Sequence, residues 1–312
     1  MKFLKNNFLI ILFIIIFTIQ CFNIWQEKYN LHQKGYEYAS EIQKECLETM
    51  DTLTDVGEIA RCERFLAEDF FDNYQKEYNF FDNFTAISNG IWSLKDLLVY
   101  FFIAISLIGV TRIFKDKVAL YMLERENYSK FLKKLFCKSY RYIWFYPLLA
   151  IIMFLFSLYK ASLDPTRPLY AFGEHFGSFI INHPYIFMIL FIINTIIFSS
   201  ICLNIALVIV RRQHNYFLAL IEIILVILAI QLFLELVVIK FIFNNLLYEF
   251  EKVNLLGHFF NFLNMPDFYI GINSNVVMFF LVNLIYLLIS FVCVYFSYRN
   301  KEKLVIDCEK NK

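Results

Sequence analysis

The chain is poor in the residues that soluble proteins use for turns and for their charged surfaces. Its 312 residues include only eight glycines and five prolines, and charged side chains make up 18% of the total. Hydrophobic residues account for 59% of the chain, aromatic residues for 20%, and the mean hydropathy is +0.55. This composition excludes an ordinary soluble globular protein.

The sequence also lacks the motifs of the common enzyme classes. Residues 173–177 (GEHFG) lack the Lys-Ser/Thr pair of a phosphate-binding loop, and no HExxH or GxSxG motif occurs. His175 and His183, with Glu174, match no metal-ligand spacing, so we interpret them as loop residues. We therefore expect no catalytic residue, metal or cofactor on this chain, no enzymatic activity of its own and no nucleic-acid partner.

The most basic segment, residues 112–141, lies between two long apolar runs. It contains nine Lys and Arg residues against three acidic ones. Because Lys and Arg resist translocation, a loop this basic between two membrane spans stays in the cytoplasm. This assignment sets the orientation of every other span.

Six apolar runs each have about the ~20 residues that a helix needs to cross a bilayer. Lys2 and Lys5 precede the first run, and no small-x-small cleavage site follows it, so we interpret it as an uncleaved anchor rather than a signal peptide. The sequence therefore predicts an all-α integral membrane protein with both termini in the cytoplasm. The abundance of Phe, Ile, Asn, Lys and Tyr suggests an AT-rich bacterial genome, and so a bacterial plasma membrane. The predicted spans are residues 6–25, 97–113, 143–159, 185–210, 216–239 and 276–295.

We divide the chain into residues 1–25, which hold the N-terminal tail and first span, 26–94, and 95–312. The segment 26–94 has six basic and fourteen acidic residues, which is compatible with the outside of the cell. Two amphipathic stretches, 29–50 and 55–80, flank a turn at 52–57 and predict a helical hairpin.

The third part, 95–312, holds the other five spans. Its cytoplasmic segment 114–141 lies between the second and third spans. Residues 244–275 are too polar to span yet rich in aromatic and apolar side chains. They are predicted to form short helices that lie at, or dip into, the outer membrane interface. The basic tail, 297–312, is again cytoplasmic.

The seven cysteines show no CxxC or Cys/His pattern typical of a metal site. Cys46 and Cys62 share the external segment, and the sequence leaves open whether they form a disulfide. The other five lie in or beside spans or in the tail, where we expect small buried or inert residues; they are Cys21, Cys137, Cys202, Cys293 and Cys308.

Two glutamates lie within the fifth span, where an ionisable group is costly and needs a reason. Glu235 follows Gln231 by one turn, so these two share a helix face, whereas Glu222 points elsewhere. One interpretation is a polar lining of a substrate path or a latch to a neighbouring helix. The other places Glu222 near the cytoplasmic interface, where it pairs with Arg211 or Arg212.

The fourth span carries five small polar residues that offer the same two interpretations. Ser200 and Asn204 belong to this set and are candidates for a substrate path. Such residues in membrane helices more often form hydrogen bonds between helices, and we favour that role. The set comprises Asn194, Thr195, Ser199, Ser200 and Asn204.

This arrangement resembles the membrane-spanning permease subunit of ABC-2 type transporters. The likeness rests on the six spans with both termini inside and on a short amphipathic helix at about 127–135 (NYSKFLKKL). It rests also on the very short turn RRQHN between spans four and five and on the outer segment 244–275. The likeness covers the whole chain as architecture, although the external segment is longer than in simpler members.

The resemblance implies a separate cytoplasmic ATPase subunit, which carries ATP and Mg, and a second permease chain, identical or different, in the bilayer. The residues expected to contact the ATPase are Glu124, Arg125, Asn127, Tyr128, Ser129 and Leu132. Asn127 or Ser129 is expected to cap the short helix, and Leu132 to fill a hydrophobic notch. A solvated loop whose lysines contact anionic lipid explains the charges equally well, but not the interleaved aromatic residues.

The aromatic-rich, nearly uncharged interior suits export of an amphipathic or hydrophobic cargo, such as a membrane-active peptide or a lipid-like compound. The alternative is a membrane sensor or assembly subunit, in which the external segment binds a ligand or partner and nothing crosses.

Overall fold

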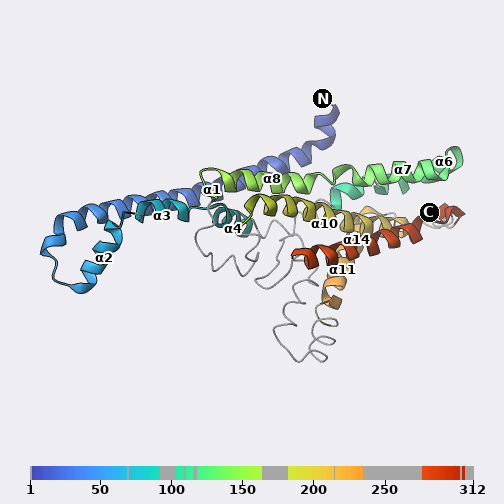
Figure 1. The fold of residues 1–312 in the computed structure, drawn as a ribbon. Coiled ribbons are helices and arrows are strands. Elements are labelled where there is room, and N and C mark those ends of the chain that lie inside the picture. Colours follow the sequence, from blue (N-terminus) through green and yellow to red (C-terminus); the bar gives the residue numbers. More distant parts are fainter. Residues whose placement is uncertain are drawn as a thin grey trace, which may run out of the picture. The chain divides into compact units, whose positions relative to one another are not determined.

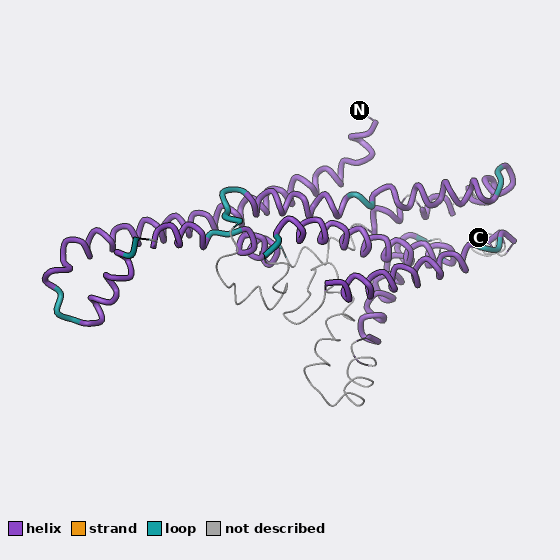
Figure 2. The backbone as a smooth tube through the Cα atoms, viewed as in Figure 1, coloured by secondary structure: helices purple, strands orange, loops and turns teal. Residues whose placement is uncertain are grey.

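The computed structural model describes residues 2–68, 70–91, 103–108, 110–114, 118–163, 182–213, 215–234, 236, 276–302 and 304–305. Within them the chain is almost wholly helical (Figures 1 and 2). The α-helices are α1 (Lys2–Thr49), α2 (Val56–Leu66), α3 (Phe70–Glu77), α4 (Phe80–Gly90), α6 (Val118–Arg125), α7 (Tyr128–Ser139), α8 (Phe145–Leu158), α10 (Pro184–Arg212), α11 (Tyr216–Leu232) and α14 (Val276–Tyr298). Two short 3-10 helices, η1 (Met50–Thr52) and η3 (Tyr140–Tyr142), accompany them.

Among the described residues, four helical runs are long and apolar enough to cross a membrane: Ile10–Thr49, Tyr128–Leu158, Pro184–Arg212 and Phe279–Tyr298. The runs Ile103–Phe114 and Tyr216–Leu232 are apolar but shorter. The chain is therefore a helical, membrane-embedded protein, while the number of six spans and their orientation stay predictions. The predicted outer helices of residues 244–275 lie outside the described residues.

The chain divides into two compact units, the first formed by residues 1–93 and 151–169. The second contains residues 94–150 and 170–312. The first predicted span thus belongs with the external segment, together with the end of α8 and the turn after it.

In the first unit, α1 continues without a break from the first span into the external segment. Its 48 residues give a length of about 72 Å at 1.5 Å per residue, more than twice the ~30 Å hydrocarbon core. This differs from the separate helix predicted at 29–50. No proline occurs before Pro147, so nothing in the sequence ends the helix at the membrane surface.

The second predicted external helix, 55–80, is instead divided into α2 and α3, and α4 begins at its last residue. The chain turns at Leu53–Asp55, inside the predicted turn, and the Asp55 side chain accepts a hydrogen bond from the Gly57 amide at the start of α2. Further breaks separate α2 from α3 and α3 from α4. Asn79 begins α4, because its side-chain oxygen accepts a hydrogen bond from the Asp82 amide at 2.9 Å, as an N-cap does.

Two features hold these helices on α1. The tip of the hairpin carries a Cys46–Cys62 disulfide with a Cα–Cα distance of 5.2 Å, which joins α1 to α2. Lower down, α4 buries Phe80, Phe84 and Ile87, and the first two rings pack on Phe154 of α8. Burial of this apolar face is the main force that holds α4 in place.

The second unit is organised around α10, which packs along α14 and α11. The turn between α10 and α11 is the predicted short one, and the Asn215 side chain caps α11 by accepting a hydrogen bond from Phe217. Helix α11 buries one stripe of residues at a spacing of four, which faces its neighbours. The stripe is Ala219, Ile223, Ile227 and Gln231.

Candidate functional site

The basic segment between the second and third predicted spans forms two helices, α6 and α7. Helix α7 is amphipathic, with Phe131, Leu135 and Ser139 buried on one face at a spacing of four. The opposite face exposes Lys130, Lys133, Lys134 and Lys138. The predicted amphipathic helix at about 127–135 is therefore present and extends to residue 139.

The buried face of α7 is fixed to the spans within the second unit. The Tyr128 hydroxyl donates a hydrogen bond to the backbone carbonyl of Tyr298 at the end of α14. Just beyond α7, the Tyr140 hydroxyl donates to the side-chain oxygen of Asn204 in α10. A displacement of α7 would therefore act on the end of α14 through Tyr128 and on α10 through Tyr140.

Tyr298 is the residue where these helices meet, and sequence reasoning missed it. It is 2% exposed, its hydroxyl donates to the Leu207 carbonyl at 2.8 Å, and its ring lies 6.2 Å from that of Phe136. The Arg211 guanidinium lies 5.9 Å from the same ring. A tyrosine at the end of a span is ordinarily an interface residue, so no sequence signal marked this role.

Four of the residues expected to contact an ATPase are exposed, namely Glu124, Arg125, Asn127 and Ser129. Leu132 and Tyr128 are half-buried, and Tyr128 is engaged within the chain rather than presented to a partner.

The expected side-chain cap is wrong. Asn127 occupies the N-cap position of α7, and its backbone carbonyl accepts from Lys130 and Phe131, but its side chain is exposed and makes no capping hydrogen bond. Ser129 lies inside the first turn of α7.

An ion pair joins the turn before α7 to its exposed face. Lys134 donates a hydrogen bond to the Glu126 carboxylate. That hydrogen bond, helped by the positive charges of Lys134 and Lys130, holds the pKa of Glu126 below its ordinary value. The pair is solvent-exposed, so it orients the side chains more than it stabilises the fold.

Two of the five polar residues of the fourth span, Asn194 and Asn204, form hydrogen bonds to another helix. Asn283 of α14 donates to Asn194 of α10 at 2.8 Å, and Asn204 donates to Ser290 of α14 at 2.9 Å. Ser200 instead donates to the carbonyl of Ile196 in its own helix. Hydrogen bonds between membrane helices stabilise their packing, so the role we favoured holds for Asn194 and Asn204. Thr195 and Ser199, like Ser200, donate to carbonyls of their own helix.

Gln231 and Glu222 lie on different faces of α11, as the sequence predicted. Gln231 is buried, whereas Glu222 lies on the exposed face. No ion pair joins Glu222 to Arg211 or Arg212 among the residues that the structure describes, and Arg211 turns toward Tyr298 instead. Glu235, the third member of the predicted set, lies outside the described residues.

A cavity of about 380 Å³ lies between α10, α11 and α14. Its walls are aliphatic apart from a few polar groups, so it suits a hydrocarbon chain better than a hydrated solute. The polar groups at its wall are Asn204, Arg212, Tyr286 and Ser290. Of the predicted path residues that the structure describes, only Asn204 lines it.

In the described part of the chain, no group of three or more His, Cys, Asp or Glu residues is placed to hold a metal ion. No family model, no curated protein and no solved structure matches the chain.

Proposed function

We propose that the chain is the membrane-spanning subunit of an ATP-driven exporter of the ABC-2 type, and that a separate cytoplasmic ATPase drives it. The observation that carries the proposal is the attachment of α7 to the spans. One face of α7 is basic and exposed, and the other is tied to α14 through Tyr128 and Tyr298. A partner that pushes on the exposed face would move the spans as a rigid body, the motion that alternating access requires.

Two hydrogen bonds support a topology of six spans. The Phe80 amide donates to the Ser162 carbonyl at 3.0 Å, so residues 80 and 162 lie on the same side of a membrane. The chain between them must cross an even number of times, and α8 is one crossing. The apolar helix Ile103–Phe114 supplies the second.

The second hydrogen bond places Tyr128 and Tyr298 on one side of the membrane in the same way. Tyr128 bonds to Tyr298, and α8, α10 and α14 lie between them. Three crossings would separate the two residues, so α11 supplies a fourth. With α1 and the apolar helix Ile103–Phe114 the proposed total is six, and the rule that basic loops stay inside would then put both termini in the cytoplasm.

The cargo is an amphipathic or hydrophobic compound, such as a membrane-active peptide or a lipid-like molecule. The aliphatic cavity beside Asn204 and Arg212 supports this class, since it accepts a hydrocarbon chain while polar groups at its wall meet a head group. A second permease chain, identical or different, would complete the path, and Glu222 on the exposed face of α11 is our candidate for that contact.

The test is purification of the tagged chain from its native host in a mild detergent, followed by mass spectrometry of what co-purifies. We expect a stoichiometric ATPase with a Walker motif. A preparation without an ATPase, under conditions that preserve a known transporter complex, would contradict the proposal.

A second test uses Lys133→Glu, which reverses a charge on the exposed face of α7. We expect loss of the ATPase with no change in thermal stability. Lys44→Glu makes the same charge change on the external part of α1 and is the matched control; it should retain the ATPase.

The alternative function is a membrane sensor, in which the external segment binds a ligand without transport. A cavity in the first unit, described below, favours it specifically. ATP hydrolysis by the purified complex would distinguish the two functions, because a sensor without an ATPase shows none.

A further inference from the structure

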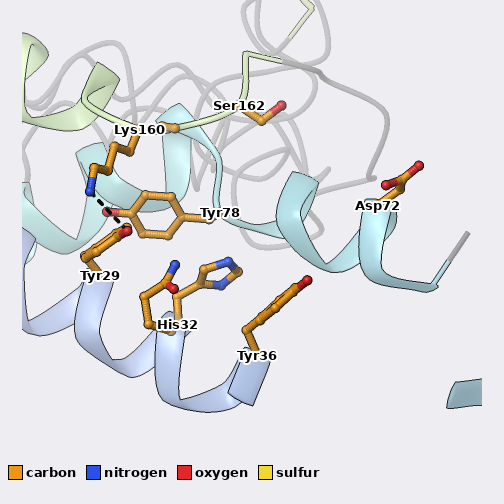
Figure 3. A pocket seen from close by; sticks show the side chains of 9 residues that line it. Tyr29, His32, Tyr36, Asp72, Tyr78, Lys160 and Ser162 are labelled. Carbon is orange, nitrogen blue, oxygen red and sulfur yellow. Dashed lines mark hydrogen bonds between the residues drawn. The ribbon is translucent and has the colours of Figure 1, made fainter. Parts of the chain in front are cut away.

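The first unit contains a cavity of about 640 Å³ on the external side of the predicted first span. Figure 3 shows that its walls come from three parts of the chain. Helix α1 contributes Tyr29, His32 and Tyr36, the junction of α3 and α4 contributes Tyr78, and the turn after α8 contributes Lys160 and Ser162. The volume is typical of a small-molecule site.

The α1 wall follows from helical spacing. Residues 29, 32, 33 and 36 recur at intervals of three and four, so their side chains share one face. With Trp25 at the membrane interface, these residues stand about 6–17 Å beyond it at 1.5 Å per residue. The cavity therefore opens just above the outer surface of the bilayer, where soluble and membrane-bound ligands both have access.

The opposite wall is fixed by backbone hydrogen bonds. Ser162 donates its amide to the Tyr78 carbonyl at 2.9 Å, and its carbonyl accepts from Phe80 at 3.0 Å. This bridge holds the turn after α8 against the junction of α3 and α4. The site is therefore preorganised, although its parts come from distant positions in the sequence.

The walls are aromatic, and their rings pack on one another. The His32 ring lies 4.9 Å from that of Tyr74 and 5.0 Å from that of Tyr78, and Tyr29 lies 5.7 Å from Tyr78. Such supported rings offer a planar ligand a rigid surface for stacking, at little cost in side-chain entropy.

Lys160 introduces a positive charge at one end of the cavity. Its ammonium lies 4.4 Å from the centroid of the Tyr29 ring and donates a hydrogen bond to the Tyr29 hydroxyl at 3.1 Å. Among the described residues, its partners are tyrosines rather than a carboxylate. The side chain is exposed, so an incoming anion can reach it.

The backbone of Lys160 is unusual as well. Its φ is 59°, in the left-handed region, and it lies two residues beyond Leu158, the last residue of α8. Glycine or asparagine normally occupies this position because other residues meet a steric penalty there. A lysine at this point places its ammonium over Tyr29 in spite of that penalty.

Other charges near the cavity do not cancel that of Lys160. Lys28 adds a second positive charge that acts on His32, and burial together with this charge lowers the pKa of His32, so that it is neutral at pH 7. Asp72 lines the end away from Lys160 (Figure 3) and is exposed, so water screens its charge.

We propose that this cavity binds a planar aromatic ligand that carries an acidic group. The acidic group pairs with the Lys160 ammonium, and the ring stacks against the wall formed by His32 and Tyr36. This site goes beyond the exporter function and exists whether or not the chain transports anything.

The experiment compares two probes that share one ring and differ in charge: N-acetyltryptophan, an anion, and neutral N-acetyltryptophanamide. The full chain is reconstituted in phosphatidylcholine nanodiscs, and both probes are titrated by saturation-transfer difference NMR. We expect the anion to bind at least tenfold more tightly. Equal binding of the two probes, or binding of neither up to several millimolar, would overturn the proposal.

Lys160→Asn tests the cation without disturbing the backbone, because asparagine tolerates a positive φ. We expect it to bind the two probes equally and weakly. Lys34→Asn removes the same charge from an exposed position on α1 and should keep the preference for the anion. Loss of that preference in Lys34→Asn, or its retention in Lys160→Asn, would contradict the assignment.

Tyr36→Leu tests the ring surface, and we expect at least tenfold weaker binding of the anionic probe. Its control is Tyr38→Leu on the same helix, where the native side chain is 61% exposed and outside the cavity. If both variants weaken binding equally, or if neither does, the cavity is not the stacking surface.

Discussion

Tyr298 bonds through its hydroxyl to α10 and through its carbonyl to Tyr128 at the start of α7. Tyr298 is buried, and both its hydroxyl and its backbone carbonyl have a hydrogen-bond partner inside the protein. A buried polar group without such a partner would be costly. The strength of the link between α7 and the spans therefore depends on single hydroxyl groups.

Removing the Tyr128 hydroxyl while keeping its ring tests this dependence. Tyr128→Phe should lower the free energy of unfolding by about 1 kcal/mol, because the hydrogen bond is lost and a carbonyl is left without its donor. This corresponds to roughly 2 °C in the apparent Tm of the purified chain. Tyr121→Phe, at a position 57% exposed on α6, should leave the Tm unchanged. Equal shifts in the two variants would contradict the link.

Gly35 allows Tyr74 to approach α1 closely. A Cβ atom at residue 35 would lie 2.1 Å from the Tyr74 hydroxyl oxygen but 3.4 Å from the nearest ring carbon. Gly35→Ala should therefore lower the apparent Tm, although glycine to alanine within a helix ordinarily stabilises by about 1 kcal/mol.

The change in apparent Tm caused by Gly35→Ala should reverse its sign when the Tyr74 hydroxyl is absent. In a Tyr74→Phe background, Gly35→Ala should raise the apparent Tm, because only the helix propensity remains. If the alanine is destabilising in both backgrounds, the hydroxyl is not the atom that requires the glycine.

His32 should make stability depend on pH. Its pKa is lowered in the folded chain by burial and by Lys28, whereas an unfolded histidine titrates near 6.5. As the pH falls below about 6.5, the unfolded chain takes up a proton before the folded chain does, so stability is lost. Between pH 7.5 and 5.5 the apparent Tm of the wild type should fall further than that of His32→Gln. Parallel curves would contradict this role.

At the scale of elements, α1 provides the platform on which the external helices are assembled. Its N-terminal part is apolar and its C-terminal part carries α2, which the Cys46–Cys62 disulfide fixes to it. Formation of this disulfide agrees with an external location, because disulfides persist in oxidising compartments.

The disulfide should hold the tip of the hairpin closed. The two cysteines are 16 residues apart, and a loop of that length gives about 3 kcal/mol of stabilisation in the chain-entropy model. Replacing both with serine should therefore speed tryptic cleavage at Arg61 and Arg64 of α2. Cys137→Ser, which removes an exposed free thiol on α7, is the control and should cleave at the wild-type rate. Unchanged cleavage in the double variant would show that packing alone holds α2.

At the scale of the whole molecule, the position of α7 relative to the membrane decides the topology. With six spans α7 is cytoplasmic. If only α1, α8, α10 and α14 crossed and the N-terminus remained inside, α7 would be external. Cys137 is an exposed free cysteine of α7, so its labelling distinguishes a cytoplasmic α7 from an external one.

A membrane-impermeant maleimide applied to intact cells should therefore leave Cys137 unlabelled. Cys293 and Cys308 are first replaced by serine, so that Cys137 is the accessible free thiol. Val56→Cys, at a position 80% exposed on the external hairpin, should label readily and serves as the positive control. Labelling of Cys137 before the cells are opened would exclude the six-span topology.

The sequence alone determined the membrane environment and the helical class, because the length and hydropathy of each apolar run can be read from consecutive residues. It also indicated the amphipathic α7 and the short turn before α11, since helical periodicity and charge are local signals. Tyr29, His32 and Tyr36 recur at intervals of three and four just beyond the first span. This aromatic helix face could have indicated the cavity from the sequence.

Tertiary structure decided the contacts between distant residues. The breaks on either side of α3 have no proline or glycine to mark them, and the junction with α4 is fixed by a bridge to Ser162, 83 residues beyond Asn79. The left-handed backbone of Lys160 and the role of Tyr298 likewise depend on partners from other helices. Such pairings are set by packing between elements, which no single segment of sequence records.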